Sequence, residues 1–300
     1  MRGFILALIT FKLMILRGNA ILKLESDVPI AEYDSSWRKL GNLDQTLKIA
    51  EISTAKIQKQ GRFSDQSSYS RDRRAINGSM VDDHAYRFIV SLHKGRTNAH
   101  TCAGTILSSK LILTAAHCIK NKTSRPTHIR VSNGDGVHIT MVGIKDYIYH
   151  EQSDIKRSIN DIGLLVLKNS IPNPEIVKLA PKNLTLIHGT MVVAYGWGRT
   201  AENGTISENL RSVELPISHP QDCSINYGLS KSRICVETQK ASTCNGDSGG
   251  PLMWKNYQIG VISAHKNSCM SGLPSVSTYL PAFTEWIYEK IRSLQEQELI

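Results

Sequence analysis

The sequence predicts an all-β fold, either a sandwich or a barrel, that ends in one helix. From residue 75 onward, short runs rich in β-forming residues alternate with turn residues, a spacing typical of sandwiches and barrels. Near the C-terminus the spacing changes to that of a helix between Ala282 and Gln297. The expected strands are Phe88–Leu92, Thr105–Leu113, His138–Ile144, Ile162–Leu167, Met191–Tyr195 and Gln258–Ser263, and the apolar face of the expected helix carries Phe283, Ile287, Ile291 and Leu294.

The first 20 residues have the pattern of a secretory signal peptide. Arg2 precedes a mostly apolar run from Phe4 to Leu16, and small residues surround a predicted cleavage point after Ala20. Lys12 interrupts the run, and the alternative is a membrane anchor. The run is shorter than the about 18 uninterrupted apolar residues that a membrane span needs. We therefore predict a cleaved signal, a secreted, extracellular protein, and no membrane attachment after the signal is removed.

Residues 21–74 are predicted to be a propeptide and linker, and residues 75–300 a single catalytic domain. The segment before residue 75 is polar and charged and contains no cysteine. Its residues 40–57 follow helical spacing, which fits either a helix that covers the neighbouring domain or a marginal helix in a disordered tail. Residues 61–74 are rich in serine and charge and are typical of an exposed linker.

The cysteines and the charge exclude several classes of function. All six cysteines follow residue 101 and none forms a C-x-x-C pair, which favours disulfides in an oxidising compartment over a zinc or redox site. The net charge is +10, but residues 1–74 hold 13 Lys+Arg and 8 Asp+Glu and so carry half of it. No basic run with interleaved aromatic residues follows, so the sequence does not support nucleic-acid binding.

Three segments carry residues suited to nucleophilic catalysis. Taken singly, each has a structural explanation, as a packed histidine, a turn aspartate or a plain glycine loop. Taken together they supply a serine nucleophile, a histidine base that removes its proton, and a carboxylate that fixes the tautomer of that base. Backbone N–H groups at Gly246 and Ser248 are suited to bind a developing oxyanion. The segments are Thr114–Cys118 with His117, Asn160–Leu165 with Asp161, and Gly246–Pro251 with Ser248.

These segments, in this order, resemble the signatures of the chymotrypsin/trypsin family of serine proteases. The segments Tyr195–Gly198 and Gly260–Ser263 resemble two further parts of that family, and the likeness covers residues 75 to about 290. The resemblance implies two six-stranded antiparallel Greek-key β-barrels followed by a C-terminal helix. It also implies a monomeric endopeptidase that needs no cofactor or metal, acts on proteins or peptides, and is open to protein protease inhibitors. The disulfides that it implies are Cys102–Cys118, Cys223–Cys235 and Cys244–Cys269.

Two other classes of protein share part of this pattern. The Ser248 segment also fits the G-x-S-x-G motif of α/β-hydrolases, but those enzymes need the order serine, acid, histidine and a βα rhythm that is missing here. The second alternative is a catalytically weak protease homologue that acts as a binding or regulatory protein. Such homologues usually lose one of the three catalytic residues, and this chain retains them all.

The resemblance also implies a zymogen. Cleavage in this family frees an N-terminus whose ammonium pairs with the aspartate before the nucleophile, here Asp247. We predict cleavage between Arg74 and Ala75, because this places Gly78 at the family's usual glycine, whereas the alternative cut before Ile76 shifts it by one. Residues 71–74 also resemble a furin-type convertase site. Ala75 is smaller than the customary isoleucine, and the inserted terminus should bind less firmly by about 2 kcal/mol.

By resemblance, four residues shape the primary specificity pocket. Ser242 lies at its base where trypsin-like members carry aspartate, which argues against a preference for arginine or lysine. The walls come from Ser263, His265 and Ser275, and side chains at the last two positions should narrow the pocket. We expect small apolar residues before the scissile bond. A chymotrypsin-like preference, an acidic preference through a charged His265, and poor activity on any substrate remain alternatives.

Two further sets of residues bear on modification and metal binding. Residues 128–140 offer only Asp135 as an acidic ligand, so no calcium site is expected. Sequons occur at Asn77, Asn121, Asn183 and Asn203, and the last three are expected to carry glycans.

Overall fold

The computed structural model describes residues 12–16, 19–23, 78–95, 99–132 and 139–300. The predicted propeptide helix, the linker and the cleavage point after Arg74 lie outside these ranges. Strands β1 (Lys12–Leu16) and β2 (Asn19–Lys23) form a two-stranded antiparallel sheet within the first of two separate units of the chain. The second unit, from Ser70 to Ile300, contains the rest of the fold.

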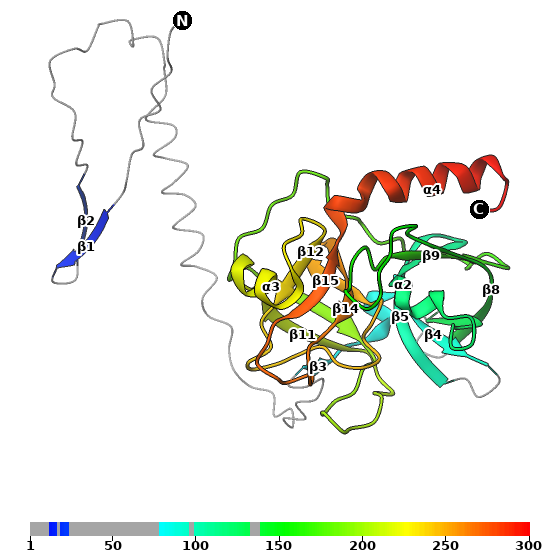
Figure 1. The fold of residues 1–300 in the computed structure, drawn as a ribbon, viewed down its shortest axis with the longest axis horizontal. Helices are drawn as coiled ribbons and strands as arrows, with labels where there is room; N and C mark the ends of the chain where they lie inside the picture. Colours follow the sequence, from blue (N-terminus) through cyan, green and yellow to red (C-terminus); the bar gives the residue numbers. More distant parts are fainter. Residues whose placement is uncertain (1–11, 17–18, 24–77, 96–98, 133–138) are drawn as a thin grey trace, which may run out of the picture. The chain divides into compact units, whose positions relative to one another are not determined.

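Six strands form a closed antiparallel barrel (Figure 1). Around the barrel the order is β4 (Ile89–Lys94), β5 (Ala99–Ser108), β6 (Leu111–Thr114), β9 (Gly163–Leu167), β8 (Ile139–Tyr149) and β7 (His128–Ser132). Aliphatic side chains fill its centre and exclude water, among them Leu92, Ile106, Leu113 and Leu165. The expected all-β architecture is confirmed.

One expected strand is in fact two. The run Thr105–Leu113 was expected to be continuous, but β5 ends at Ser108 and β6 begins at Leu111. The chain reverses at residues 109–110, where Lys110 N donates to Ser108 Oγ at 3.3 Å. Because Ile106 and Ile112 then face each other in register, the apolar run stays buried on both sides of the turn, and periodicity alone does not reveal the reversal.

Seven strands form the second sheet, and six of them curl into a barrel. An antiparallel bridge joins Ile217 to Val236, and Ser218 N donates to Cys235 O at 2.9 Å, so the chain after β11 meets β12 and the ends of the six-stranded part come together. Strand β3 extends the outer edge of β11. The order is β12 (Arg233–Val236), β15 (Ser275–Tyr279), β14 (Tyr257–Ala264), β13 (Pro251–Trp254), β10 (Met191–Gly196), β11 (Arg211–Pro216) and β3 (Ser79–Met80).

The expected C-terminal helix is present as α4 (Thr284–Glu296), after the 3-10 turn η3 (Leu280–Phe283) (Figure 1). Its apolar face packs on the first barrel through Ile287 and Leu294. The structure adds η2 (Asp83–Tyr86), α2 (Ala116–Lys120) and α3 (Pro220–Tyr227), which periodicity did not predict. Among the described residues, no helix is both long and apolar enough to cross a membrane.

Three disulfides tie together the loops around the two barrels. They are the pairs that the family resemblance implied. None of the cysteines in this part of the chain is free.

Candidate active site

His117 lies on α2, directly after the last residues of β6, and its ring faces Asp161. Nδ1 of His117 is 2.7 Å from Asp161 Oδ2, and the backbone N of His117 donates to Oδ1 at 2.8 Å. An ionised carboxylate only accepts hydrogen bonds, so Nδ1 carries the imidazole proton. The lone pair is then on Nε2, the atom that a general base must present to a serine hydroxyl.

Asp161 is buried and receives donors from both barrels. Besides the bonds from His117, Ser263 Oγ on β14 donates to Oδ2 at 2.5 Å, and Thr278 Oγ1 on β15 donates to Asp161 O at 2.8 Å. Burial alone would raise the pKa of this carboxyl, but the hydrogen bonds from His117 and Ser263, with the attraction of His117, hold the pKa below its ordinary value. Asp161 is therefore a fixed negative charge at neutral pH.

The loop that carries Ser248 is held between the barrels. Ser248 O accepts from Ala103 N of β5 at 2.8 Å, and Gly249 N donates to Ile262 O of β14 at 2.8 Å. Gly249 has φ of +81°, and a Cβ there would lie 2.2 Å from Thr114 Oγ1 and 2.3 Å from Ala103 O. Only glycine fits this position, which fixes the backbone directly after Ser248.

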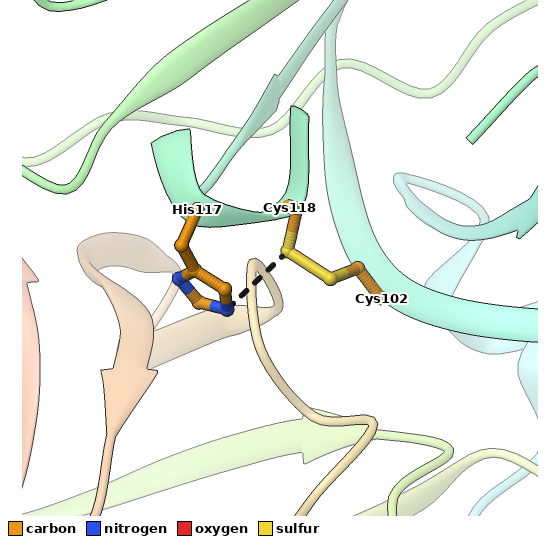
Figure 2. A group of neighbouring side chains, drawn as sticks. All are labelled: Cys102, His117 and Cys118. Carbon is orange, nitrogen blue, oxygen red and sulfur yellow. Dashed lines mark hydrogen bonds between the residues drawn. A yellow bond between two sulfur atoms is a disulfide. The ribbon is translucent and has the colours of Figure 1, made fainter. Parts of the chain in front are cut away.

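The hydroxyl of Ser248 and the ring of His117 are not hydrogen-bonded to each other in this structure. Figure 2 shows His117 Nε2 directed at the Cys102–Cys118 disulfide, where Cys118 Sγ lies 3.6 Å away. Within the described part of the chain no hydrogen bond joins Nε2 to Ser248 Oγ. With the imidazole proton on Nδ1, Nε2 has a lone pair, and the disulfide sulfur carries no hydrogen, so this contact is not a hydrogen bond. Catalytic hydrogen bonds in unliganded enzymes are often long and tighten only when substrate binds.

Two backbone N–H groups near Ser248 are open. Neither Gly246 N nor Ser248 N donates to an acceptor among the residues that the structure describes, whereas Asp247 N between them donates to Cys244 O at 3.0 Å. These are the two donors predicted for the oxyanion. Their availability fits the prediction, which stays a prediction about their role.

His100 holds the peptide of Gly246 in place, a contact that no sequence motif predicted. His100 Nε2 is 2.8 Å from Gly246 O, and Nδ1 is 2.6 Å from Ser91 Oγ. A carbonyl only accepts, so Nε2 carries the proton and Nδ1 accepts from Ser91. Burial lowers the pKa of His100 to about 4, and the ring is neutral at physiological pH. The only feature of the sequence that could have indicated this contact is the polar pair Ser91 and His100, nine residues apart.

Asp247 is buried beneath the segment Gly196–Gly198. Its Oδ1 accepts from Gly198 N at 2.7 Å and its Oδ2 from Cys244 N at 2.8 Å. A Cβ on Gly196 or Gly198 would lie 2.2 or 2.3 Å from a carboxylate oxygen, and both glycines are therefore required. Burial raises the pKa of Asp247 to about 6, although the two backbone N–H groups act in the opposite direction. Among the described residues no cation pairs with Asp247, so a negative charge in this buried position destabilises the fold.

The four predicted pocket residues have different surroundings. Ser263 and Ser275 lie on the paired strands β14 and β15, His265 directly follows β14, and Ser242 lies in the loop before Cys244. Ser242 and Ser275 are buried, and Ser242 Oγ donates to Thr243 O at 2.8 Å. The Ser263 hydroxyl is bound to Asp161. Because Asn245 Oδ1 accepts, His265 Nε2 donates to it at 3.2 Å, and the remaining ring nitrogen is buried without a partner in the described residues. Burial lowers the pKa of His265.

Two clusters of the described residues have potential metal ligands within 4.8 Å of one another. One is Cys102, His117 and Cys118, shown in Figure 2, and the other is Cys244, His265 and Cys269. In each cluster the two sulfurs form a disulfide, and a disulfide offers no thiolate to a metal ion. In each cluster this leaves the histidine as the one available ligand.

Comparisons with known proteins agree with this geometry. The family model described as Trypsin matches residues 75–287. Chymotrypsin-2 of Vespa crabro is 33% identical over 223 residues, which cover 71% of this chain and 97% of that protein. Trypsin alpha-4 of Lucilia cuprina is 29% identical, with 74% of this chain and 89% of the relative covered. Trypsin of Sarcophaga bullata is also 29% identical, and the match covers 74% of this chain and 91% of that protein.

Two antiparallel barrels with a histidine–aspartate pair and a serine loop between them define a serine endopeptidase, a hydrolase that acts on protein substrates. The chain belongs to the trypsin family. Because its relatives include proteins named both trypsin and chymotrypsin, family membership leaves the preferred substrate residue undecided.

Proposed function

We propose that this chain is a secreted zymogen whose mature form hydrolyses peptide bonds through an acyl-enzyme on Ser248. The observation that carries the proposal is the pair of His117 with the buried Asp161, beside a serine loop with two open N–H groups. The signal-like N-terminus and three disulfides support passage through an oxidising compartment. The matched family range begins at residue 75, which fits a catalytic domain of residues 75–300 behind a signal at 1–20 and a propeptide at 21–74.

In the first half of the reaction, His117 Nε2 leaves the disulfide and takes the proton of Ser248 Oγ as the oxygen attacks the substrate carbonyl. The negative charge that forms on the carbonyl oxygen is bound by the N–H groups of Gly246 and Ser248. The new imidazolium is stabilised by Asp161, which stays ionised. His117 then gives the proton to the leaving amine, the C–N bond breaks, and an ester on Ser248 remains.

In the second half, water replaces the amine. His117 removes a proton from the water, the resulting hydroxide attacks the ester, and the same N–H groups bind the oxyanion. The proton returns through His117 to Ser248 Oγ, and the carboxylic acid product leaves. No step needs a metal or a cofactor in this mechanism.

Activation by cleavage after Arg74 is supported by the anchoring of the residues that follow. Strand β3 pairs with β11, where Met80 faces Arg211, and Arg211 Nη2 donates to Gly78 O at 3.2 Å. Two strand spacings, about 10 Å, separate β3 from β10, whose Gly196 covers Asp247. The three residues 75–77 span at most about 10 Å when extended. The two lengths are comparable, which supports the proposal that a new ammonium on Ala75 pairs with Asp247.

The test is fluorophosphonate labelling of the secreted protein before and after a convertase or trypsin cut. Labelling is expected only after the cut, on a chain that begins at Ala75, and is expected to vanish in Ser248→Ala. Labelling of the uncut chain would contradict the zymogen. A clean cut without labelling would instead favour the catalytically weak homologue.

Replacing Ala75 by isoleucine is expected to raise activity. The larger side chain buries about three more carbons, each contributing about 0.8 kcal/mol, and so shifts the mature enzyme toward its ordered form. The measurement is kcat/KM per titrated active site for both cleaved proteins. Unchanged turnover of the titrated enzyme would count against a poorly inserted terminus.

The narrowed pocket is proposed to accept small apolar residues before the scissile bond. Ser242 offers no charge to a cation, and His265 stands where a side chain reduces the entrance. Because burial lowers the pKa of His265, its ring is neutral near pH 7 and offers little attraction to an acidic residue. A peptide library that varies only the residue before the scissile bond tests this preference. Cleavage after arginine or lysine would reject it.

We further propose a monomer that is activated by another protease and is regulated by protein inhibitors. Asn121, Asn183 and Asn203 are exposed and suited to carry glycans. A glycosidase shift that persists after all three are replaced by glutamine would argue against these sites.

A further inference from the structure

A groove of about 560 Å³ lies beside the predicted catalytic residues. One wall is residues 155–159, which lead directly into Asp161. The opposite wall is Ala264–Lys266, which follows Ser263, the residue bound to Asp161. The end of α3 and the two residues after it, residues 226–229, also line the groove. The groove therefore begins where the reaction site ends and runs away from it along the end of β14.

The lining of this groove is positively charged. It contains Lys156, Arg157, Arg233 and Lys266 and no aspartate or glutamate. Arg157 is partly compensated by Asp154, whose Oδ2 lies 3.6 Å from Nε in an exposed pair. Lys266 lies over the ring of Tyr227 at 5.5 Å, a contact that leaves its charge in place. Among the described residues, neither Lys156 nor Lys266 has an ion pair with a carboxylate.

Arg233 holds the groove open in one shape. Its Nε donates to Ser158 O at 3.0 Å and its Nη2 to Arg157 O at 2.9 Å, while Nη1 donates to Tyr227 O on the other side. The guanidinium thus joins two walls that are about 70 residues apart in the sequence. All these partners are neutral carbonyls, so its positive charge stays uncompensated at the base of the groove. A fixed shape lowers the entropy lost on binding.

We infer that this groove binds an acidic side chain of the substrate, two to four residues before the scissile bond. The inference rests on the proposed cleavage by Ser248 and on the resemblance of Gly260–Ser263 to the family's substrate-binding strand, whose continuation Ala264–Lys266 lines the groove. A chain running on past His265 meets Lys266 and then the wall at Lys156. Aspartate and glutamate are the residues whose charge complements this lining.

The first arm of the test measures cleavage by the full chain after activation. Peptides keep the best-accepted residue before the scissile bond and carry aspartate, alanine or lysine at the three preceding positions. Aspartate in at least one position is expected to raise kcat/KM about tenfold over alanine, and lysine to lower it. The preference should shrink severalfold between 0.05 and 0.5 M NaCl, because salt screens exposed charges.

Variants assign the effect to the groove. Lys156→Gln combined with Lys266→Gln is expected to reduce the aspartate-to-alanine ratio about fivefold, while Arg233 is left intact because it holds both walls. Lys168→Gln is the matched control, since Lys168 is an exposed lysine that does not line the groove, and it should keep the ratio of the unaltered enzyme. A fall of the same size in the control would overturn the assignment.

The second arm measures binding without catalysis. The cleaved Ser248→Ala chain is titrated with fluorescent acidic, alanine and lysine peptides, and the acidic peptide is expected to bind about tenfold more tightly than its alanine counterpart. Equal affinity together with equal kcat/KM would overturn the inference. If the acidic preference in binding persists although Ser248 is never labelled and no peptide is cut, the proposed function fails and the groove assignment stands.

Discussion

Replacing Asp161 by asparagine is expected to lower kcat/KM about 10⁴-fold without unfolding the protein, a factor taken from another member of the family. His117 N, His117 Nδ1 and Ser263 Oγ all donate to this carboxylate. An amide N–H₂ facing Nδ1 forces the imidazole proton to Nε2, and the ring then has no lone pair for Ser248. The measurement is kcat/KM per milligram of activated protein at pH 8, with circular dichroism to verify the fold.

The matched control for this change is Ser263→Ala. It removes one of the donors but keeps the carboxylate and the tautomer of His117, so the expected loss is no more than about tenfold. Similar losses in the two variants would mean that the polar contacts of Asp161, rather than the tautomer that it imposes, determine activity.

Replacing Asp247 by asparagine is expected to lower the activity of the cleaved enzyme by about 10² to 10⁴-fold. Removing one partner of a buried ion pair costs about 3–5 kcal/mol, and about 1.4 kcal/mol corresponds to a factor of ten. Without the carboxylate the new ammonium has no charged partner, and one of the two N–H groups of Gly198 and Cys244 loses its acceptor because the amide keeps a single oxygen. The rate of fluorophosphonate labelling after cleavage measures the effect, and full activity would reject the ammonium–Asp247 pair.

In the uncleaved chain, the free energy of unfolding should depend on pH through the same carboxylate. The pKa of Asp247 is raised from its ordinary value of 3.8 to about 6, so the folded state binds more protons between these values. The corresponding stability is present below about pH 4 and lost as the pH rises through about 6, by about 3 kcal/mol. Urea unfolding of the uncleaved chain and its Asp247→Asn variant should differ by that change between pH 4 and 7. A constant difference would mean that this carboxylate is already paired before cleavage.

The sequence predicted the parts of the fold that rest on local pattern. Short β-rich runs predicted every strand of the closed barrel except β7, with β5 and β6 taken as one, but only β10 and β14 of the second sheet. Helical spacing predicted α4 to within about two residues of its ends. The reversal between Ser108 and Leu111 was missed because both arms are apolar. Helix α3 was missed because its surface is polar, with no buried residue, and only Pro220 signals its start.

The candidate site could be predicted only where its residues lie in continuous motifs. His117, Asp161 and Ser248 each stand in a recognisable segment. The hydrogen bonds that orient the site join residues far apart in the sequence. Ser263 donates to Asp161 across 102 residues, and His100 donates to Gly246 across 146. Arg233 stands in an ordinary strand, and its partners are carbonyls of two loops that no pattern in one sequence brings together.

The positively charged groove has a consequence for the activation of the zymogen. Residues 71–74 of the chain itself carry three cations and one carboxylate just before the predicted cut. With the proposed groove and pocket, we expect Lys156 and Lys266 to repel this segment and Ser242 to offer Arg74 no counter-charge. One mature molecule should then be a poor activator of the next. Activity should rise in proportion to the outside protease, without a lag and self-accelerating burst, and further conversion should stop when that protease is withdrawn.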